Sequence, residues 1–205
     1  MSNVTDHTET GVRERVLVTA ERLFREIGYQ KTTVADIARV LRMSPANVYR
    51  FFDSKKSINI GVAQRLMGQV EAQSEAIANR SGSPAKRLRE LLTSIHRMNA
   101  ERYVGDSKMH EMVAVAMEEN WDGCRAHIDR ITGAIAKVIA DGIDTGEFQV
   151  SDAYLAAVCT CTAMIRFFHP QLIAESADKP SPTLDQMIDF VIAALQTRAG
   201  LSRSI

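Results

Sequence analysis

Apolar residues recur at helical spacing along most of this chain. Residues 12–27 show the pattern clearly, because their apolar positions fall at i, i+4, i+7, i+8 and i+11 and so share one side of a helix. These residues are Val16, Ala20, Leu23, Phe24 and Ile27. No stretch alternates between apolar and polar residues as a half-buried strand does. The sequence therefore predicts an all-α protein.

Capping residues, glycines and prolines divide the rest of the chain into further helices. The predicted helix at residues 55–79 is long enough to leave one domain and enter another, and we interpret it as a mechanical link. The predicted helices, about nine in all, cover residues 12–27, 33–41, 44–52, 55–79, 85–103, 107–119, 121–145, 151–169 and 183–197.

The segment TTVADIARVLRMSPANVYRFFDSKK, residues 32–56, is the most informative stretch. Thr33 can cap a first helix, and Ser44 can cap a second helix that has Pro45 at its first position. Between them, Arg42-Met43-Ser44 interrupts the apolar pattern. Two short helices joined by a tight turn form a helix-turn-helix, whose second helix enters the major groove of DNA.

This stretch resembles the TetR family of bacterial transcription regulators, with about 50 residues in matching spacing. One departure is Arg42, which stands in the turn where the family usually has glycine. A glycine followed by Gly146-Glu147-Phe148 also resembles the C-terminal domains of the family. The matching residues in the N-terminal part are Phe24, Gly28, Tyr29, Thr32, Thr33, Val34, Asp36, Ile37, Ala38, Ser44, Val48, Tyr49, Phe52, Ser54, Lys55 and Ile58.

The exposed face near the start of the second short helix should contact base edges. Asn47 can pair with adenine, Arg50 with guanine or phosphate, and Ala46 can approach a thymine methyl group. The resemblance implies that Tyr49 and Lys55 bind backbone phosphate and that Thr33 does so from the preceding helix. The predicted DNA-binding residues are Thr33, Ser44, Pro45, Ala46, Asn47, Tyr49, Arg50 and Lys55.

Composition adds a modest charge asymmetry to this picture. The 205-residue chain has no net charge, but residues 1–60 carry ten Lys and Arg against seven Asp and Glu. This gives the N-terminal part a net charge of +3 and the remainder −3, which fits a basic DNA-binding head. No apolar run reaches the roughly 20 residues of a membrane span, and no signal peptide is apparent. We therefore expect a cytoplasmic protein without membrane association.

The predicted domains are a disordered tail at residues 1–10, the helix-turn-helix domain at 11–57, a helical ligand-binding and dimerisation domain at 58–199, and a tail at 200–205. The last helix has an apolar arc wider than one core contact needs. The helix before it, which opens at Ser151-Asp152, is rich in small residues. We expect these two helices to form the seam of a homodimer, through Leu155, Cys159, Thr162, Leu184, Met187, Ile188, Val191 and Leu195.

The resemblance also implies a pocket for an unknown small-molecule effector, which changes the spacing of two DNA-binding heads. Methionine is adaptable and suits a tolerant pocket, although residues of these types at helical spacing also form ordinary core. The candidate pocket residues are Met98, Tyr103, Met109, Met112, Trp121, Met164, Phe167 and Phe168.

Other kinds of chemistry find less support in the sequence. His96, His110, His127 and His169 show no i, i+4 pairing, and Cys159-x-Cys161 lacks the usual zinc spacing, so we expect no metal and no cofactor. The three cysteines suit a reducing compartment, and a redox role for Cys159 and Cys161 stays open beside an inert one.

The sequence has no motif that pairs a nucleophile with a base and no phosphate-binding glycine loop, so an enzyme is not expected. The leading hypothesis is a homodimeric repressor that binds a palindromic operator and is released by a ligand. A helical protein–protein interaction module, a ligand-independent regulator and an activator remain as alternatives.

Overall fold

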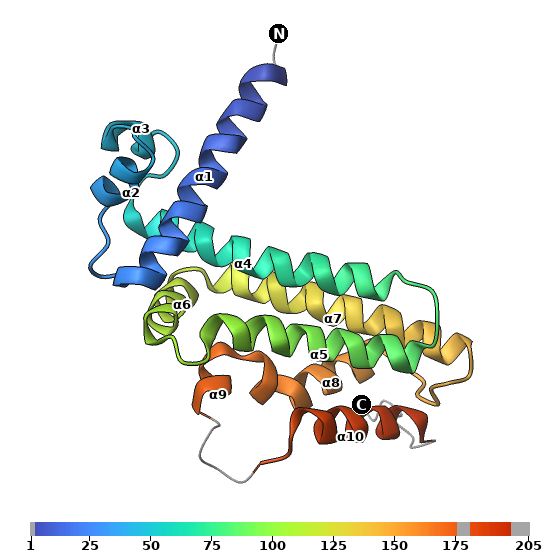
Figure 1. The fold of residues 1–205 in the computed structure, drawn as a ribbon. Helices are drawn as coiled ribbons and strands as arrows, with labels where there is room; N and C mark the ends of the chain where they lie inside the picture. Colours follow the sequence, from blue (N-terminus) through green and yellow to red (C-terminus); the bar gives the residue numbers. More distant parts are fainter. Residues whose placement is uncertain (1–2, 176–180, 198–205) are drawn as a thin grey trace. The chain divides into compact units, whose positions relative to one another are not determined.

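The computed structural model describes residues 3–175 and 181–197, and every regular element among them is an α-helix (Figure 1). This confirms the all-α prediction. Among the described helices, none combines the length and apolarity that a membrane crossing requires. The ten helices of the described ranges are α1 (Asn3–Ile27), α2 (Val34–Val40), α3 (Pro45–Tyr49), α4 (Lys55–Ala78), α5 (Pro84–Tyr103), α6 (Ser107–Glu119), α7 (Trp121–Asp144), α8 (Ala153–Phe168), α9 (Pro170–Glu175) and α10 (Leu184–Gln196).

Helix α1 starts earlier than the sequence pattern predicted. It begins at Asn3, so residues 3–10 are helical where a disordered tail was expected. This segment has no proline, and Gly11 costs a helix interior only about 1 kcal/mol relative to alanine, which does not end the helix. The other predicted tail, residues 200–205, lies outside the described residues.

Helix α9 was not predicted. The sequence pattern places no helix between residues 169 and 183, but in the structure Pro170 opens a short one. Proline suits the first position of a helix because its missing N–H would have no intrahelical partner there. The described chain therefore has one helix more than the pattern indicated.

Two compact units make up the fold. The first comprises residues up to Met67 together with Asp106–Cys124, and the second comprises Gly68–Gly105 and the residues from Arg125 onward. Helix α4 begins in the first unit and ends in the second. Helix α6 belongs to the first unit, although the sequence places it among the helices of the C-terminal half. The predicted functional boundary between residues 57 and 58 stays a prediction.

In the first unit, α1 packs against α2 and α6, and α2 packs against α3. The side chains of Met109 and Met112 on α6 are fully buried. Asn59 on α4 is buried as well, and its side-chain Nδ2 donates a hydrogen bond of 3.1 Å to the carbonyl of Met112. A buried amide needs such a partner, because an unpaired one costs about 1–3 kcal/mol. This contact therefore fixes α6 on α4 within the unit.

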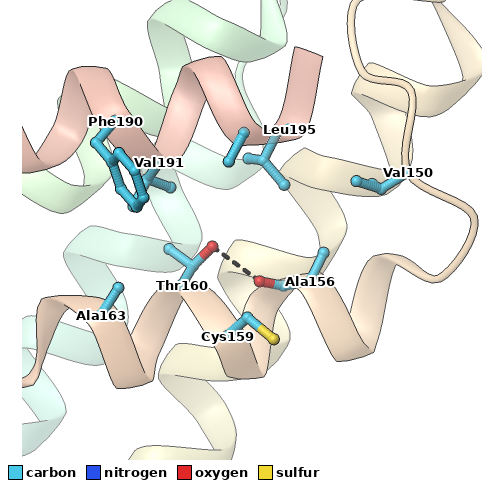
Figure 2. Close-up of a pocket in the computed structure, with 9 residues that line it drawn as sticks. Val150, Ala156, Cys159, Thr160, Ala163, Phe190, Val191 and Leu195 are labelled. Carbon is cyan, nitrogen blue, oxygen red and sulfur yellow. Dashed lines mark hydrogen bonds between the residues drawn. The ribbon is translucent and has the colours of Figure 1, made fainter. Parts of the chain in front are cut away.

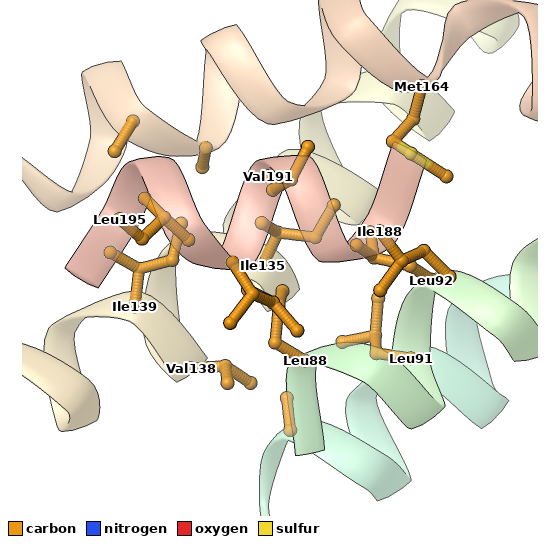
Figure 3. Packing of buried hydrophobic residues seen from close by; sticks show 14 of the residues in the cluster. Leu88, Leu91, Leu92, Ile135, Val138, Ile139, Met164, Ile188, Val191 and Leu195 are labelled. Atoms are coloured by element: carbon orange, nitrogen blue, oxygen red, sulfur yellow. The ribbon is translucent and has the colours of Figure 1, made fainter. Parts of the chain in front are cut away.

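In the second unit, a contiguous apolar core lies between α5, α7, α8 and α10 (Figure 3). Each of these helices contributes residues that recur three or four positions apart, which is the spacing of one helical face. Fully burying one such side chain contributes about 1.5–3 kcal/mol relative to exposure. The core residues labelled in Figure 3 are Leu88, Leu91, Leu92, Ile135, Val138, Ile139, Met164, Ile188, Val191 and Leu195.

The Gly146-Glu147-Phe148 motif connects the end of α7 to the start of α5. Gly146 has φ of 76°, in the left-handed region that favours glycine. The Glu147 carboxylate accepts hydrogen bonds from Ser83 Oγ at 2.8 Å and from the Ala85 backbone N–H at 3.1 Å. Phe148 is buried, and its amide donates to the Gly142 carbonyl. The motif thus closes α7 and caps α5 at the same time.

A charged cluster joins α4 to α7 within the second unit. His127 Nδ1 lies 2.7 Å from Glu71 Oε1, and Arg130 Nε lies 2.5 Å from Glu71 Oε2. Burial lowers the pKa of His127, although its hydrogen bond to Glu71 acts in the opposite direction. Burial would raise the pKa of Glu71, but hydrogen bonds from Arg130 and His127 outweigh it and leave the pKa below its ordinary value. At neutral pH, a neutral His127 donates its Nδ1 proton to an ionised Glu71.

Acidification should therefore destabilise the protein through His127. Because the pKa of His127 is lower in the folded protein, the unfolded chain binds a proton more readily as the pH falls below about 6.5. The free energy of unfolding should decrease from pH 7.5 to pH 5.5, and His127→Gln should make this decrease smaller. Urea unfolding at several pH values measures both. A variant whose pH profile matches that of the wild type would contradict this prediction.

Candidate nucleic-acid interface

The N-terminus of α2 is fixed by a reciprocal cap. Thr33 Oγ1 accepts the Asp36 N–H at 3.1 Å, and the Asp36 carboxylate accepts the Thr33 N–H at 3.0 Å. Hydrogen bonds from the Thr33 side chain and backbone lower the pKa of Asp36. The predicted cap is confirmed, and it leaves Thr33 exposed at the start of the helix.

The turn between α2 and α3 requires a left-handed residue at Arg42. Its φ is 55°, which a non-glycine residue adopts at a cost of about 1–2 kcal/mol. The following Met43 N–H donates to the Ala38 carbonyl at 3.0 Å and closes the turn. The structure therefore keeps a tight turn without the glycine that is usual in the family that the sequence resembles.

Helix α3 is short, and its orientation follows from two buried side chains. Ser44 caps it by accepting the Asn47 N–H at 3.2 Å, and Pro45 occupies the first position, as predicted. Val48 is fully buried and Phe52, just beyond the helix, is almost so. The opposite side of the helix is consequently turned towards solvent.

The exposed side of α3 carries the residues that we expect to contact DNA. Pro45, Ala46 and Arg50 are exposed, Tyr49 keeps 49% of its surface accessible, and Asn47 is half-buried. None of these side chains contributes to the core of the unit. They are available to a ligand that docks along this helix.

Lys55, at the start of α4, is held by the loop that precedes α2. Its Nζ donates to the carbonyls of Tyr29 and Gln30 at 3.0 and 3.2 Å, and it lies 4.5 Å from the centre of the Tyr29 ring. An ammonium group has three donors, so one remains for a phosphate. Lys55 therefore has a structural role, because it binds the loop before α2. The phosphate contact that the resemblance implies for Lys55 stays a prediction.

The sequence analysis did not predict a structural role for Arg13. Arg13 Nη1 on α1 donates a hydrogen bond of 2.6 Å to the Phe51 carbonyl, and its guanidinium carbon lies 4.3 Å from the centre of the Phe52 ring. No spacing rule predicts this contact, because it joins residues 38 positions apart in the sequence.

The predicted effector-pocket residues fall in both compact units. Met109 and Met112 are buried in the first unit, and Trp121 in that unit is 60% exposed. The others, Met98, Tyr103, Met164, Phe167 and Phe168, belong to the second unit. Within it, Met164 is part of the apolar core, and Met98, Phe167 and Phe168 pack against that core. The pocket stays a prediction.

The predicted dimer seam needs a correction at three of its eight residues. Ile188, Val191 and Leu195 are buried within the chain's own core, with 0%, 5% and 4% of their surfaces exposed. They therefore cannot supply much surface to a partner. Of the others, Cys159 and Thr162 are exposed, and Leu155, Leu184 and Met187 are half-buried.

The outward faces of α8 and α10 carry a different set of apolar side chains. Phe190 on α10 is 67% exposed, and Tyr154, Val158 and Ile165 on α8 are 56%, 39% and 48% exposed. Tyr154, Val158 and Ile165 share one face of α8, because they lie four and seven positions apart, and exposed apolar patches mark interaction sites. The sequence analysis did not include these four residues in the seam, and their part in a dimer stays a prediction.

A groove of about 120 Å³ lies between α8 and α10 (Figure 2). The Thr160 hydroxyl, which faces this groove, is satisfied by a hydrogen bond of 2.8 Å to the Ala156 carbonyl of its own helix. The groove is otherwise almost wholly apolar, and none of the predicted effector residues contributes to it. Its lining consists of Val150, Ala156, Cys159, Thr160, Ala163, Phe190, Val191, Ala194 and Leu195.

Known proteins resemble this chain in both of its halves. Residues 16–59 match the family described as bacterial regulatory proteins, tetR family, and residues 84–187 match the tetracyclin repressor-like C-terminal domain. The Staphylococcus aureus protein IcaR, a negative transcriptional regulator of the biofilm operon icaADBC, is 43% identical over 47 residues. The match covers 23% of this chain, and the chain spans about a quarter of the length of that relative.

Solved structures share the fold over most of the chain. A transcriptional regulator of the TetR/AcrR family from Thermobifida fusca has a TM-score of 0.63 at 23% identity and covers 94% of this chain and 100% of its own. Thermus thermophilus FadR, a transcriptional repressor in complex with lauroyl-CoA, has a TM-score of 0.59 at 16% identity, with 94% and 97% covered. These similarities show the fold alone.

A capped helix-turn-helix with a solvent-facing second helix, followed by a helical C-terminal half, is the architecture of a DNA-binding transcription regulator. Both halves match models of one family, and the C-terminal match alone covers half of the chain. This chain belongs to the TetR family.

Proposed function

We propose that this protein is a homodimeric repressor that binds a palindromic operator and is released by a small molecule. The observation that carries the proposal is the exposed face of α3, where Ala46, Asn47 and Arg50 are free of the core and lie on a helix that Ser44 and Val48 hold in place. Major-groove base edges are recognised by side chains of these types. Repression is supported by the similarity to the negative regulator IcaR, which is 43% identical over 47 residues.

A second copy is needed because one head offers few base contacts. Helix α3 has only five residues, whereas two heads on a two-fold dimer contact two half-sites of a palindrome. The exposed apolar residues of α8 and α10 provide a surface for that second copy. Because such a repressor acts on chromosomal DNA, its proposed location is the cytoplasm.

The effector acts by favouring one of two states. A ligand shifts this equilibrium only by the difference between its affinities for the DNA-binding and the non-binding state. Thermus thermophilus FadR was solved with lauroyl-CoA, which supports effector binding by this fold. An activator or a protein–protein module on the same fold is the competing function, and loss of DNA binding would favour the module.

Selection of genomic fragments by the purified protein tests the proposal. Fragments of the source genome that bind at moderate salt are sequenced and searched for a shared palindrome. We expect one palindrome, with half-sites about one helical turn apart or a multiple of it. If no sequence is enriched, with or without candidate effectors, the proposal of an operator-binding repressor fails.

Asn47→Ala should relax base preference at one position in each half-site. The lost bidentate contact is worth roughly 1–3 kcal/mol of discrimination at that base pair. The substitution should leave the head folded, because Ser44 Oγ accepts its hydrogen bond from the Asn47 backbone N–H, which alanine keeps. Binding to a panel of single-base operator variants measures the effect, with Asn79→Ala as the control for loss of an exposed asparagine. Unchanged preference at every position would show that Asn47 does not contact bases.

A further inference from the structure

Arg13 connects α1 to the end of α3, the proposed recognition helix, in two ways. Its Nη1 donates to the Phe51 carbonyl at 2.6 Å, two residues past the end of α3. Its guanidinium carbon also lies 4.3 Å from the centre of the Phe52 ring. A guanidinium is suited to this double contact because it is planar, stacks on aromatic faces and carries five donors in a rigid fork.

The recognition helix depends on contacts of this kind. An isolated helix of five residues is not stable in water, because helix nucleation is costly and most helical stability in proteins comes from packing. At the C-terminal end of α3, the Phe51 and Phe52 amides both donate to the Val48 carbonyl. The Phe51 carbonyl would be left for solvent, and Arg13 binds it. The contact therefore fixes the end of α3 opposite the Ser44 cap.

We propose that Arg13 is a positioning residue for DNA recognition, which acts through Phe51 and Phe52 to fix the orientation of α3. The inference rests on the proposed DNA binding. Asn47 and Arg50 can meet base edges only at one tilt of the helix, because a bidentate hydrogen bond tolerates little misalignment. Arg13 thus supports sequence preference without contacting DNA itself.

This role differs measurably from a phosphate contact by the same side chain. Each phosphate contact that is lost lowers the slope of log K against log salt by about 0.9, or about 1.8 for two heads. A positioning residue leaves this slope unchanged and lowers only the preference for the specific sequence. The two roles therefore predict opposite results in two independent measurements.

The test measures both quantities for the full-length wild type and the variants Arg13→Ala, Arg13→Lys and Arg15→Ala. The probes are the palindrome selected from the source genome and scrambled DNA of the same length. For Arg13→Ala we expect the preference for the palindrome over scrambled DNA to fall about tenfold, which is the discrimination that one good base contact provides. The salt slope should equal that of the wild type. Arg13→Lys keeps the charge but cannot stack in the same plane, so its preference should lie between the two. Arg15→Ala is the control: it removes a second exposed arginine of α1 and so measures the effect of losing one positive charge from this helix.

Thermal unfolding followed by circular dichroism accompanies each variant. If Arg13→Ala unfolds the head, the comparison of Arg13→Lys with the wild type decides the question. Unchanged preference in the Arg13 variants, or a salt slope lowered by about 0.9 per head in Arg13→Ala, would overturn the positioning role. A wild-type protein without preference for any sequence would instead defeat the proposed function, and this inference with it.

Discussion

Phe190→Glu should disrupt the proposed homodimer and weaken operator binding about 100-fold or more. Phe190 is the most exposed of the large apolar side chains on α8 and α10, at 67%. A carboxylate there would be buried against the second copy, and an unpaired buried charge is strongly unfavourable. When the dimer is lost, the second head no longer binds at high effective concentration, a gain that reaches 10²–10⁴-fold in linked systems.

Sedimentation equilibrium and operator titration measure the two parts of this prediction. The matched control is Val104→Glu directly after α5, where an apolar side chain of the same unit is 57% exposed. It introduces the same charge outside α8 and α10 and should keep both dimer and affinity. A Phe190→Glu protein that remains dimeric would show that the second copy binds elsewhere. A monomer with undiminished operator affinity would show that two heads are not required.

The helix-turn-helix could be predicted in detail because its signals are local. Thr33 and Ser44 mark the two helix starts, because each side chain caps a backbone N–H three residues further on, and Pro45 occupies the first position of α3. The spacing of Val48 and Phe52 then fixes which side of α3 is buried. Each of these rules needs only neighbouring residues, which a sequence displays directly.

The outward face of α10 could be predicted only in part, because its apolar arc covers two sides. Periodicity shows that Ile188, Val191, Leu195 and Phe190 are apolar, but not which of them faces the chain's own core. The packing of α10 against α5 and α8 makes that choice, and it buries the first three and exposes Phe190. Chain order was similarly misleading for α6, whose Met109 and Met112 pack with the N-terminal helices.

Arg87→Ala should lower the free energy of unfolding by about 3 kcal/mol. Arg87, on α5, is buried, with 7% of its surface exposed. Its Nη1 donates to the carbonyl of Ala78, the last residue of α4, and its Nη2 donates to Asp141 Oδ2 on α7, both at 2.9 Å. Removing one partner of a buried ion pair costs about 3–5 kcal/mol. We expect the lower end of this range, because Asp141 is partly exposed and also lies near Lys137.

Arg89→Ala is the matched control, two residues further along the same helix. Arg89 pairs with Asp189 at the surface, where both side chains are largely exposed, and such pairs contribute about 0–1 kcal/mol. Urea unfolding of the two variants should therefore separate them by about 2 kcal/mol or more. Equal losses would mean that the Arg87 contacts add no more than a surface pair. Because Arg87 binds the carbonyl of the last residue of α4, Arg87→Ala should also loosen the C-terminal end of that helix, whereas Lys55, a predicted DNA-binding residue, lies at its other end.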